Sequence, residues 1–189
     1  MYKGKLTRLR RLEKKDVEII LQYFNNYELH RNLGAPPLPV SQEDEVKFIE
    51  GVNAAFNQRS QFTFGIEELE ADSLIGTVSL FDMDWVNRVT EIGISIFNPK
   101  YWGKGYGSDA MIVLLDFAFS VLDLHNVSLR VNEFNQRAIK AYEKIGFTHQ
   151  GKIRESQYID GKRHDVLLMD MLKSEFLDKH GVLPKGTGR

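Results

Sequence analysis

The chain contains no cysteine, no long apolar run and almost no net charge. The lack of cysteine excludes disulfides, a thiol nucleophile and thiolate metal sites, and it suits a reducing compartment. A formal net charge of -1 gives no electrostatic reason to expect binding to nucleic acid or to an anionic membrane. No apolar run approaches the roughly 20 residues of a membrane span. The first residues also lack the apolar core of a secretory signal, so we expect a cytoplasmic protein.

The length and composition predict one compact domain. The chain has 189 residues, 42% of them hydrophobic, which is enough for a sizeable core. It shows no internal repeat, low-complexity segment or linker that would divide it. We expect the domain to span residues 1–180 and residues 181–189 to form a disordered tail, because that tail is short and contains Pro184, Gly186 and Gly188.

The periodicity of apolar residues predicts a chain that mixes strands and helices. Strands are expected over residues 6–12, 62–67, 74–81, 90–97, 127–131, 149–159 and 163–172, and helices over 14–25, 110–122, 135–145 and from 42 to about 56. Residues 32–40, with one glycine and three prolines, are expected to form a loop. This order predicts a mixed α/β fold, with a mostly antiparallel twisted sheet and helices on both faces.

A glycine-rich stretch, WGKGYGSDA at residues 102–110, lies between a predicted strand and a predicted helix. Backbone N–H groups at such a turn point out of a helix N-terminus, where a phosphate or pyrophosphate binds well. A P-loop does not fit, because Lys104 is followed by glycine and Asn98 stands at the first glycine position. A dinucleotide fingerprint does not fit either, because Ser108 replaces the third glycine. A flexible turn without a ligand is the alternative for this segment alone.

A second stretch, NQRAIKAYEKIGF at residues 135–147, follows about thirty residues later. Together the two stretches resemble the GNAT superfamily of acetyl-CoA-dependent N-acetyltransferases, most of all the branch with bacterial ribosomal-protein N-terminal acetyltransferases and spermidine acetyltransferases. The family's loop motif [QR]-x-x-G-x-[GA] is met by Gly105 and Gly107. Its second motif, N-x-x-A-x-x-x-Y-x-K-x-G-F, is met by Asn135, Ala138, Tyr142, Lys144, Gly146 and Phe147. The resemblance covers nearly the whole chain in its order of elements.

One position departs from the family's loop motif. Trp102 stands where Gln or Arg is usual, and its side chain cannot make the polar contact that either would make. The backbone amides of the loop are unaffected by this change, so acetyl-CoA binding is still expected, with an altered affinity. The indole could pack against the adenine side of the cofactor or against an adjoining subunit.

The resemblance implies the GNAT acyl-CoA N-acyltransferase fold, in which two neighbouring strands splay apart to admit the pantetheine arm. The amides of residues 103–108 would hold the pyrophosphate, helped by the dipole of the following helix. Lys104 would add charge or remain solvated, and Asn135 would bind pantetheine, cap the next helix, or do both. The residues expected to bind acetyl-CoA are Ile94, Ile96, Phe97, Gly103, Lys104, Gly105, Tyr106, Gly107, Ser108 and Asn135.

Two residues are candidates for catalysis. The attacking amine must be neutral, and a lysine-type amine with a pKa of roughly 10.4 needs more help than a chain N-terminus at about 7.7–8.0. Glu91 is the candidate base, directly or through water, and its alternative is a structural carboxylate paired with Arg88 or Arg130. Tyr142 lies where the family places the acid that protonates the departing CoA thiolate, and its alternative is a core tyrosine.

The acceptor side is expected to comprise the first two helices, residues 32–40 and the final hairpin. A cluster of acidic residues there would suit a polycation such as spermidine, although a solvated face is the alternative on each element. The acidic candidates are Glu28, Glu43, Asp44, Asp82, Asp84, Glu155 and Asp160. Trp85 would line the acceptor-binding site or fill the core, and His30 and His164 could lie near that site.

The leading hypothesis is therefore an N-acetyltransferase that moves acetyl from acetyl-CoA directly to a primary amine. No covalent acyl-enzyme is expected, since there is no cysteine and Ser108 has no evident base beside it. The acceptor would be a protein N-terminal α-amine or a small amine, including a polyamine of the spermidine type. An acyl-CoA sensor without turnover is the alternative from another class. We expect no metal, nucleic acid or membrane partner, whereas a homodimer would suit this family.

Overall fold

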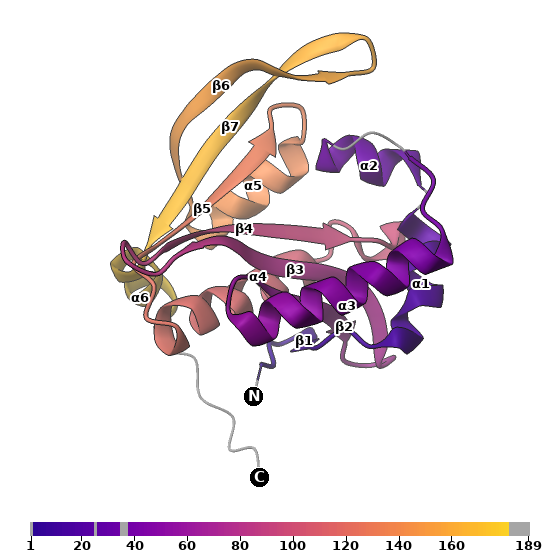
Figure 1. Ribbon diagram of the computed structural model, residues 1–189. Coiled ribbons are helices and arrows are strands. Elements are labelled where there is room, and N and C mark those ends of the chain that lie inside the picture. The colour runs from indigo at the N-terminus through magenta and orange to yellow at the C-terminus, as the bar shows by residue number, and fades with distance from the viewer. Residues whose placement is uncertain (1, 25, 35–37, 182–189) are drawn as a thin grey trace.

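The computed structural model describes residues 2–24, 26–34 and 38–181 and confirms the mixed α/β fold (Figure 1). Its strands are β1 (Thr7–Arg10), β2 (Phe62–Glu68), β3 (Ser73–Asp84), β4 (Val89–Ile96), β5 (Asn126–Asn132), β6 (Thr148–Ile159) and β7 (Lys162–Leu172). They form one sheet in the order β1-β2-β3-β4-β5-β7-β6. Neighbouring strands are antiparallel except β4 and β5, which are parallel. Apart from Gly181, the expected disordered tail lies outside the described residues.

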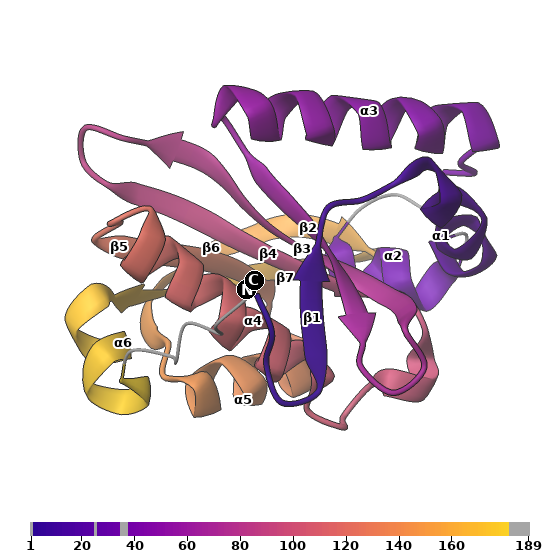
Figure 2. The ribbon, with the colours of Figure 1, turned by 90° about the horizontal axis from the view of Figure 1, so that it is seen from below.

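Helices cover both faces of the sheet, as expected. They are α1 (Val17–Phe24), α2 (Tyr27–Leu33), α3 (Gln42–Gln58), α4 (Tyr106–Asp116), α5 (Gln136–Ile145) and α6 (Lys173–His180). Figure 2 shows α3 on one side of the sheet and α4 and α5 on the other. None of the helices in the described residues has the length and apolar character needed to cross a membrane.

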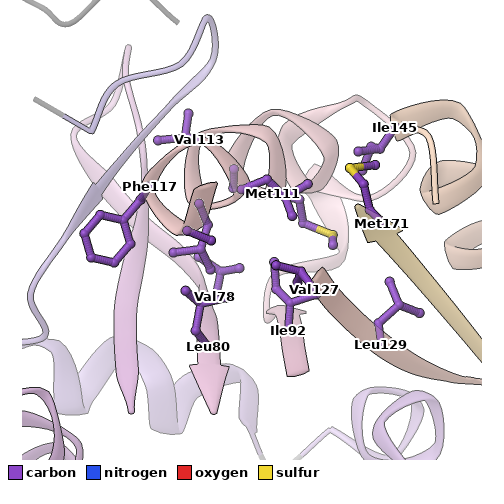
Figure 3. Packing of buried hydrophobic residues seen from close by; sticks show 14 of the residues in the cluster. Val78, Leu80, Ile92, Met111, Val113, Phe117, Val127, Leu129, Ile145 and Met171 are labelled. Atoms are coloured by element: carbon purple, nitrogen blue, oxygen red, sulfur yellow. The ribbon is translucent and has the colours of Figure 1, made fainter. Parts of the chain in front are cut away.

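Each face of the sheet carries its own apolar core. On the face of α4, Met111, Val113 and Phe117 pack over strand residues such as Val78 and Ile92 (Figure 3). Because α4 is apolar nearly all round, it is buried between the sheet and its neighbours, as its sequence predicted. The smaller core on the other face joins α1, α2 and α3 to the sheet through residues that include Ile20, Leu29, Ile49 and Phe97.

The sheet opens between β4 and β5. Their parallel pairing ends at Glu91 and Ser128, although β4 continues to Ile96 and β5 to Asn132. Beyond that point β5 pairs only with β7 among the described strands, as far as Asn132 opposite Val166. This is the splay that the family resemblance implied, and it leaves one edge of β4 without a neighbouring strand.

Two helices were missed by the sequence analysis. α2 lies mostly between the helix predicted at 14–25 and the loop predicted at 32–40, and it extends into that loop as far as Leu33. Its capping residues were visible in the sequence. Asn26 caps it by accepting from the backbone N–H of Glu28 at 2.8 Å, and Gly34 ends it with φ of 69°.

The second missed helix, α6, follows β7 directly, and its Phe176 is fully buried. The sequence feature that indicates this helix is Glu175, whose carboxylate accepts from the backbone N–H of Leu172, the N-cap residue, at 2.9 Å.

The helix after the glycine-rich stretch begins at Tyr106, four residues before the predicted start at 110. Glycine and serine are weak helix formers, so propensity alone placed the start too late. The α-helix ends at Asp116, and Phe117–Val121 continues as a π-helical turn. The early start matters for the site, because residues 106–108 now form the first turn of a helix.

Candidate active site

The first cavity, of about 460 Å³, lies between β4, the first turn of α4 and one face of α5. Most of the residues predicted to bind the cofactor line it: Ile94, Ile96, Gly103, Gly105, Gly107, Ser108 and Asn135. Lys104 and Tyr106 do not line it, and the Tyr106 ring instead packs edge-on against Tyr101, with ring centroids 5.0 Å apart.

Phe97 is a correction to the predicted set. Its side chain is buried in the core beneath α1 and α3, and only 2% of the residue is exposed. Its backbone N–H already donates to the carbonyl of Ile75 at 2.8 Å. Phe97 therefore belongs to the sheet and its core, and its amide is not available to a pantetheine arm.

The glycine loop presents the N-terminus of α4 to this cavity. Gly103 and Gly105 have φ of 70° and 90°, a left-handed conformation that glycine adopts without steric cost. Gly105 is the N-cap, so the N–H groups of residues 106–108 have no partner within the helix. A helix N-terminus of this kind attracts anions through these N–H groups and through the helix dipole.

Asp109 ties the first turn of α4 to the N-terminal segment. Its carboxylate accepts hydrogen bonds from the backbone N–H groups of Lys5, Leu6 and Thr7 at 2.9, 3.0 and 2.9 Å, and from the Thr7 hydroxyl at 2.7 Å. Gly4 is needed beside it, because a Cβ there would lie 2.2 Å from a carboxylate oxygen. These contacts explain why the helix begins so early despite its glycine.

We therefore expect Asp109→Ala to destabilise the fold by about 2–4 kcal/mol, because several donors lose their acceptor and Thr7 is fully buried. The measurement is the free energy of unfolding in urea. Asp116→Ala is the matched control on the same helix, since Asp116 accepts only from the Ser120 hydroxyl among the described residues. An equal loss in both variants would contradict the anchoring role of Asp109.

Trp102 makes a polar contact that the sequence analysis did not foresee. Its indole N–H donates to the carbonyl of Ile96 at 2.8 Å, at the end of β4. The guanidinium of Arg137 lies over the indole ring, 4.2 Å from its centroid. The indole therefore fastens the loop to β4 and holds a cation at the cavity wall, near the position where the family usually has Gln or Arg.

Three cations of α5 also line the first cavity and were not predicted. Arg137, Lys140 and Lys144 recur at helical spacing, so they share one face of α5. None of them forms an ion pair within the described part of the chain. Unpaired cations beside a helix N-terminus suit a ligand that carries several phosphates. The helical spacing of these three cations is the sequence feature that could have identified them as cavity residues.

A second cavity, of about 520 Å³, adjoins the first. The two share a wall formed by Asn32, Leu33, Ile94, Ser95, Asn135 and Tyr142. The hydroxyl of Ser95 is buried there and has no hydrogen-bond partner in the described residues. A buried hydroxyl without a partner is costly in a folded protein, so this wall fits a polar ligand.

Glu91 lines the second cavity and forms an ion pair. Its Oε2 lies 3.0 Å from Nε of Arg130, while Arg88, the other partner considered, binds Asp123 at 2.8 Å. Burial raises the pKa of Glu91, Arg130 lowers it, and nearby Asp82 raises it again. The net shift is upward, which moves the carboxylate towards the range of a useful general base.

Tyr142 lines both cavities and so connects the two. Burial raises its pKa to about 12, because a phenolate there would lose hydration. The hydroxyl therefore stays protonated at neutral pH and can act as a hydrogen-bond donor. Asn135, beside it in the shared wall, caps α5 by accepting from the backbone N–H of Ala138 at 3.2 Å. The capping role of Asn135 is thus confirmed, and its contact with a ligand remains a prediction.

The acidic residues expected at the acceptor side do not line the second cavity. Several have local partners: Glu43 pairs with Lys47, Asp44 accepts from Ser41 at the start of α3, Asp84 accepts from residues 86 and 87, and Asp160 binds Tyr27 and Arg31. Glu155 lines a separate surface hollow on the β6–β7 hairpin. The predicted acidic cluster is therefore absent from the lining of this cavity.

Three other acceptor-side candidates also lie outside the second cavity. Trp85 packs edge-on against buried Phe62, with ring centroids 6.3 Å apart, but it is 43% exposed, so it does not fill the core. His30 is buried in α2, and His164 lies between Glu133 and the ring of Phe134.

No group of three or more histidine, aspartate or glutamate side chains in the described residues is arranged to hold a metal ion.

Comparison with known proteins gives the family. The profile of the acetyltransferase (GNAT) domain matches residues 7–148. An N-acetyltransferase of Bacillus licheniformis, p20, is 29% identical over 93% of this chain and 97% of its own length. The spermidine N(1)-acetyltransferase of Vibrio cholerae is 30% identical over 90% of this chain and 95% of its own. A crystal structure of the Vibrio cholerae spermidine N-acetyltransferase with CoA and spermine superposes with a TM-score of 0.81 at 29% identity, covering 92% and 99% of the two chains. The chain therefore belongs to the GNAT acetyltransferase family and is an acetyl-CoA-dependent N-acetyltransferase.

Proposed function

We propose that the enzyme transfers acetyl from acetyl-CoA directly to a primary amine across the wall that the two cavities share. The observation that carries this proposal is the position of Tyr142 and Ser95, which line both cavities at the point where β4 and β5 have separated. A thioester reached from the first cavity and an amine reached from the second would meet there. From here the first is called the cofactor cavity and the second the acceptor groove.

The cofactor cavity has groups that suit each part of acetyl-CoA. The amides of residues 106–108 would hold the pyrophosphate at the N-terminus of α4. Arg137, Lys140 and Lys144 would add positive charge along the phosphate-bearing end. The free edge of β4 around Ile94 would pair with the amides of the pantetheine arm, much as an added strand would.

Glu91 would activate the amine. The amine nitrogen attacks the thioester carbonyl as its proton passes to the Glu91 carboxylate, directly or through water. A new C–N bond forms, the C–S bond breaks, and CoA departs as a thiolate. A cysteine-like thiol has a pKa of about 8.5, well below the pKa of about 12 of Tyr142, so Tyr142 would stabilise the thiolate mainly by donating a hydrogen bond. The thiolate can take its final proton from water.

The test is release of CoA thiol from acetyl-CoA against a panel of amines. The panel holds spermidine, spermine, lysine, aminoglycosides and peptides with free N-termini, because the Vibrio cholerae relative is a spermidine acetyltransferase. Release with one class would support the proposal and identify the acceptor type. Thermal stabilisation by CoA without release from any amine would contradict turnover and support an acyl-CoA-binding sensor.

A further inference from the structure

The acceptor groove has an unusual charge pattern for a site that would bind a polycation. Glu91 and Arg130 are the only charged side chains among the described residues that line it. The polar remainder is neutral and consists of hydroxyl and amide side chains: Asn32, Gln61, Thr77, Ser79, Ser95, Asn132, Asn135, Tyr142 and Gln157. The lining therefore carries one positive and one negative charge, side by side.

A polyamine would find only one opposite charge in this lining, although the hydroxyl and amide oxygens can accept hydrogen bonds from it. Each ammonium group that leaves water needs a carboxylate or several hydrogen-bond acceptors. The groove offers one carboxylate, and Arg130 beside it would repel any further ammonium group. Asp82 is near enough to raise the pKa of Glu91, but it does not line the groove.

Arg130 is also placed to bind an anion. Its Nε contacts Oε2 of Glu91 at 3.0 Å, and no hydrogen bond joins either of its Nη atoms to the described residues. Its side chain is 59% exposed, against 16% for Glu91, so the guanidinium can move while the carboxylate stays fixed on β4. Two free N–H-bearing nitrogens in one plane match the two oxygens of a carboxylate.

From this geometry we propose that the acceptor is a primary amine with a carboxylate next to it, as in a free α-amino acid. The amine would lie at Glu91 and the carboxylate would be bound by the Nη groups of Arg130, which makes Arg130 the residue that determines acceptor class. The ion pair between the two side chains would open to take up the opposite charges of the acceptor. This inference rests on the proposed function, because it concerns the acceptor of the same transfer.

The experiment compares acceptors that differ only in the carboxylate. Lysine is measured against cadaverine, its decarboxylated form, and a set of α-amino acids against their amides, by release of CoA thiol. We expect kcat/KM to be about 10- to 100-fold higher for the carboxylate-bearing member, the range of a charge-assisted hydrogen bond. In the amide pairs basicity cannot produce that preference, because the α-amine of an amino acid is more basic than that of its amide and so is harder to deprotonate.

Variants of Arg130 sharpen the test. Arg130→Gln should remove the preference and bring both members of each pair to similar kcat/KM values, and Arg130→Glu should reverse it in favour of cadaverine. Arg154→Gln is the matched control, since it removes an exposed arginine from the β6–β7 hairpin outside the groove. A preference of the unmodified enzyme for cadaverine or spermidine would overturn the inference. An unchanged ratio in both Arg130 variants would overturn it as well.

A binding measurement distinguishes failure of the proposed function from failure of this inference. If no amine released CoA thiol, binding of lysine and cadaverine would be measured by calorimetry with the CoA-loaded protein. Tighter binding of lysine that is lost in Arg130→Gln would support the acceptor class although turnover had failed. Equal binding of the two amines would overturn it.

Discussion

Glu91→Gln is expected to lower kcat/KM by about 100-fold or more at neutral pH, the usual contribution of a positioned general base. The pH dependence should change as well. In the unmodified enzyme the acidic limb reflects Glu91, whose pKa burial raises and Arg130 partly lowers again. Without that carboxylate the amine must lose its proton to solvent, so the rate should rise with pH towards the pKa of the amine itself. The measurement is kcat/KM from pH 5 to 10.

Arg130→Gln is the control for this prediction, used with an amine that has no carboxylate. It keeps the base but removes the cation that lowers the pKa of Glu91, so the acidic limb should move to higher pH while the plateau is retained. The two variants thus separate loss of the base from loss of its ion-pair partner. If Glu91→Gln left the profile of the enzyme unchanged, Glu91 would be a structural carboxylate.

Tyr142→Phe is expected to lower kcat by about 10- to 100-fold, with little change in the KM for acetyl-CoA. Phenylalanine keeps the ring that lines both cavities and removes only the hydroxyl that would donate to the departing thiolate. The loss should be partial, since a thiol with a pKa of about 8.5 is already a fair leaving group. It should also be nearly constant between pH 5 and 10, because the pKa of Tyr142 is about 12.

Tyr27→Phe provides a matched control for Tyr142. Tyr27 is an exposed tyrosine of α2 whose hydroxyl donates to Asp160 and lies outside both cavities. The same loss in both variants would point to a general effect of removing a hydroxyl. A kcat that is unchanged in Tyr142→Phe would remove Tyr142 from the mechanism.

Some elements of the fold could be predicted because their signals are local. The helix over 136–145 has an asparagine at its N-cap and Gly146 at its C-cap, and β6 and β7 form an antiparallel hairpin that turns at Asp160-Gly161. α6 and the early start of α4 depend instead on distant contacts. Phe176 packs on Phe119, with ring centroids 5.3 Å apart, and Asp109 binds the N-terminal segment more than a hundred residues away. Neither contact leaves a mark in the local pattern of apolar residues.

By itself, the sequence determined the family, the fold class and the presence of a glycine loop ahead of a helix. These follow from backbone conformation and from short motifs, which involve neighbours along the chain. The tertiary structure alone decided that Glu91 pairs with Arg130, that Trp102 binds the carbonyl of Ile96, and that Tyr142 lines two cavities. It also showed that the expected acidic residues do not line the acceptor groove. The physical reason is that charge pairing and cavity shape depend on which strands and helices meet in space, and distances of a few ångströms decide them.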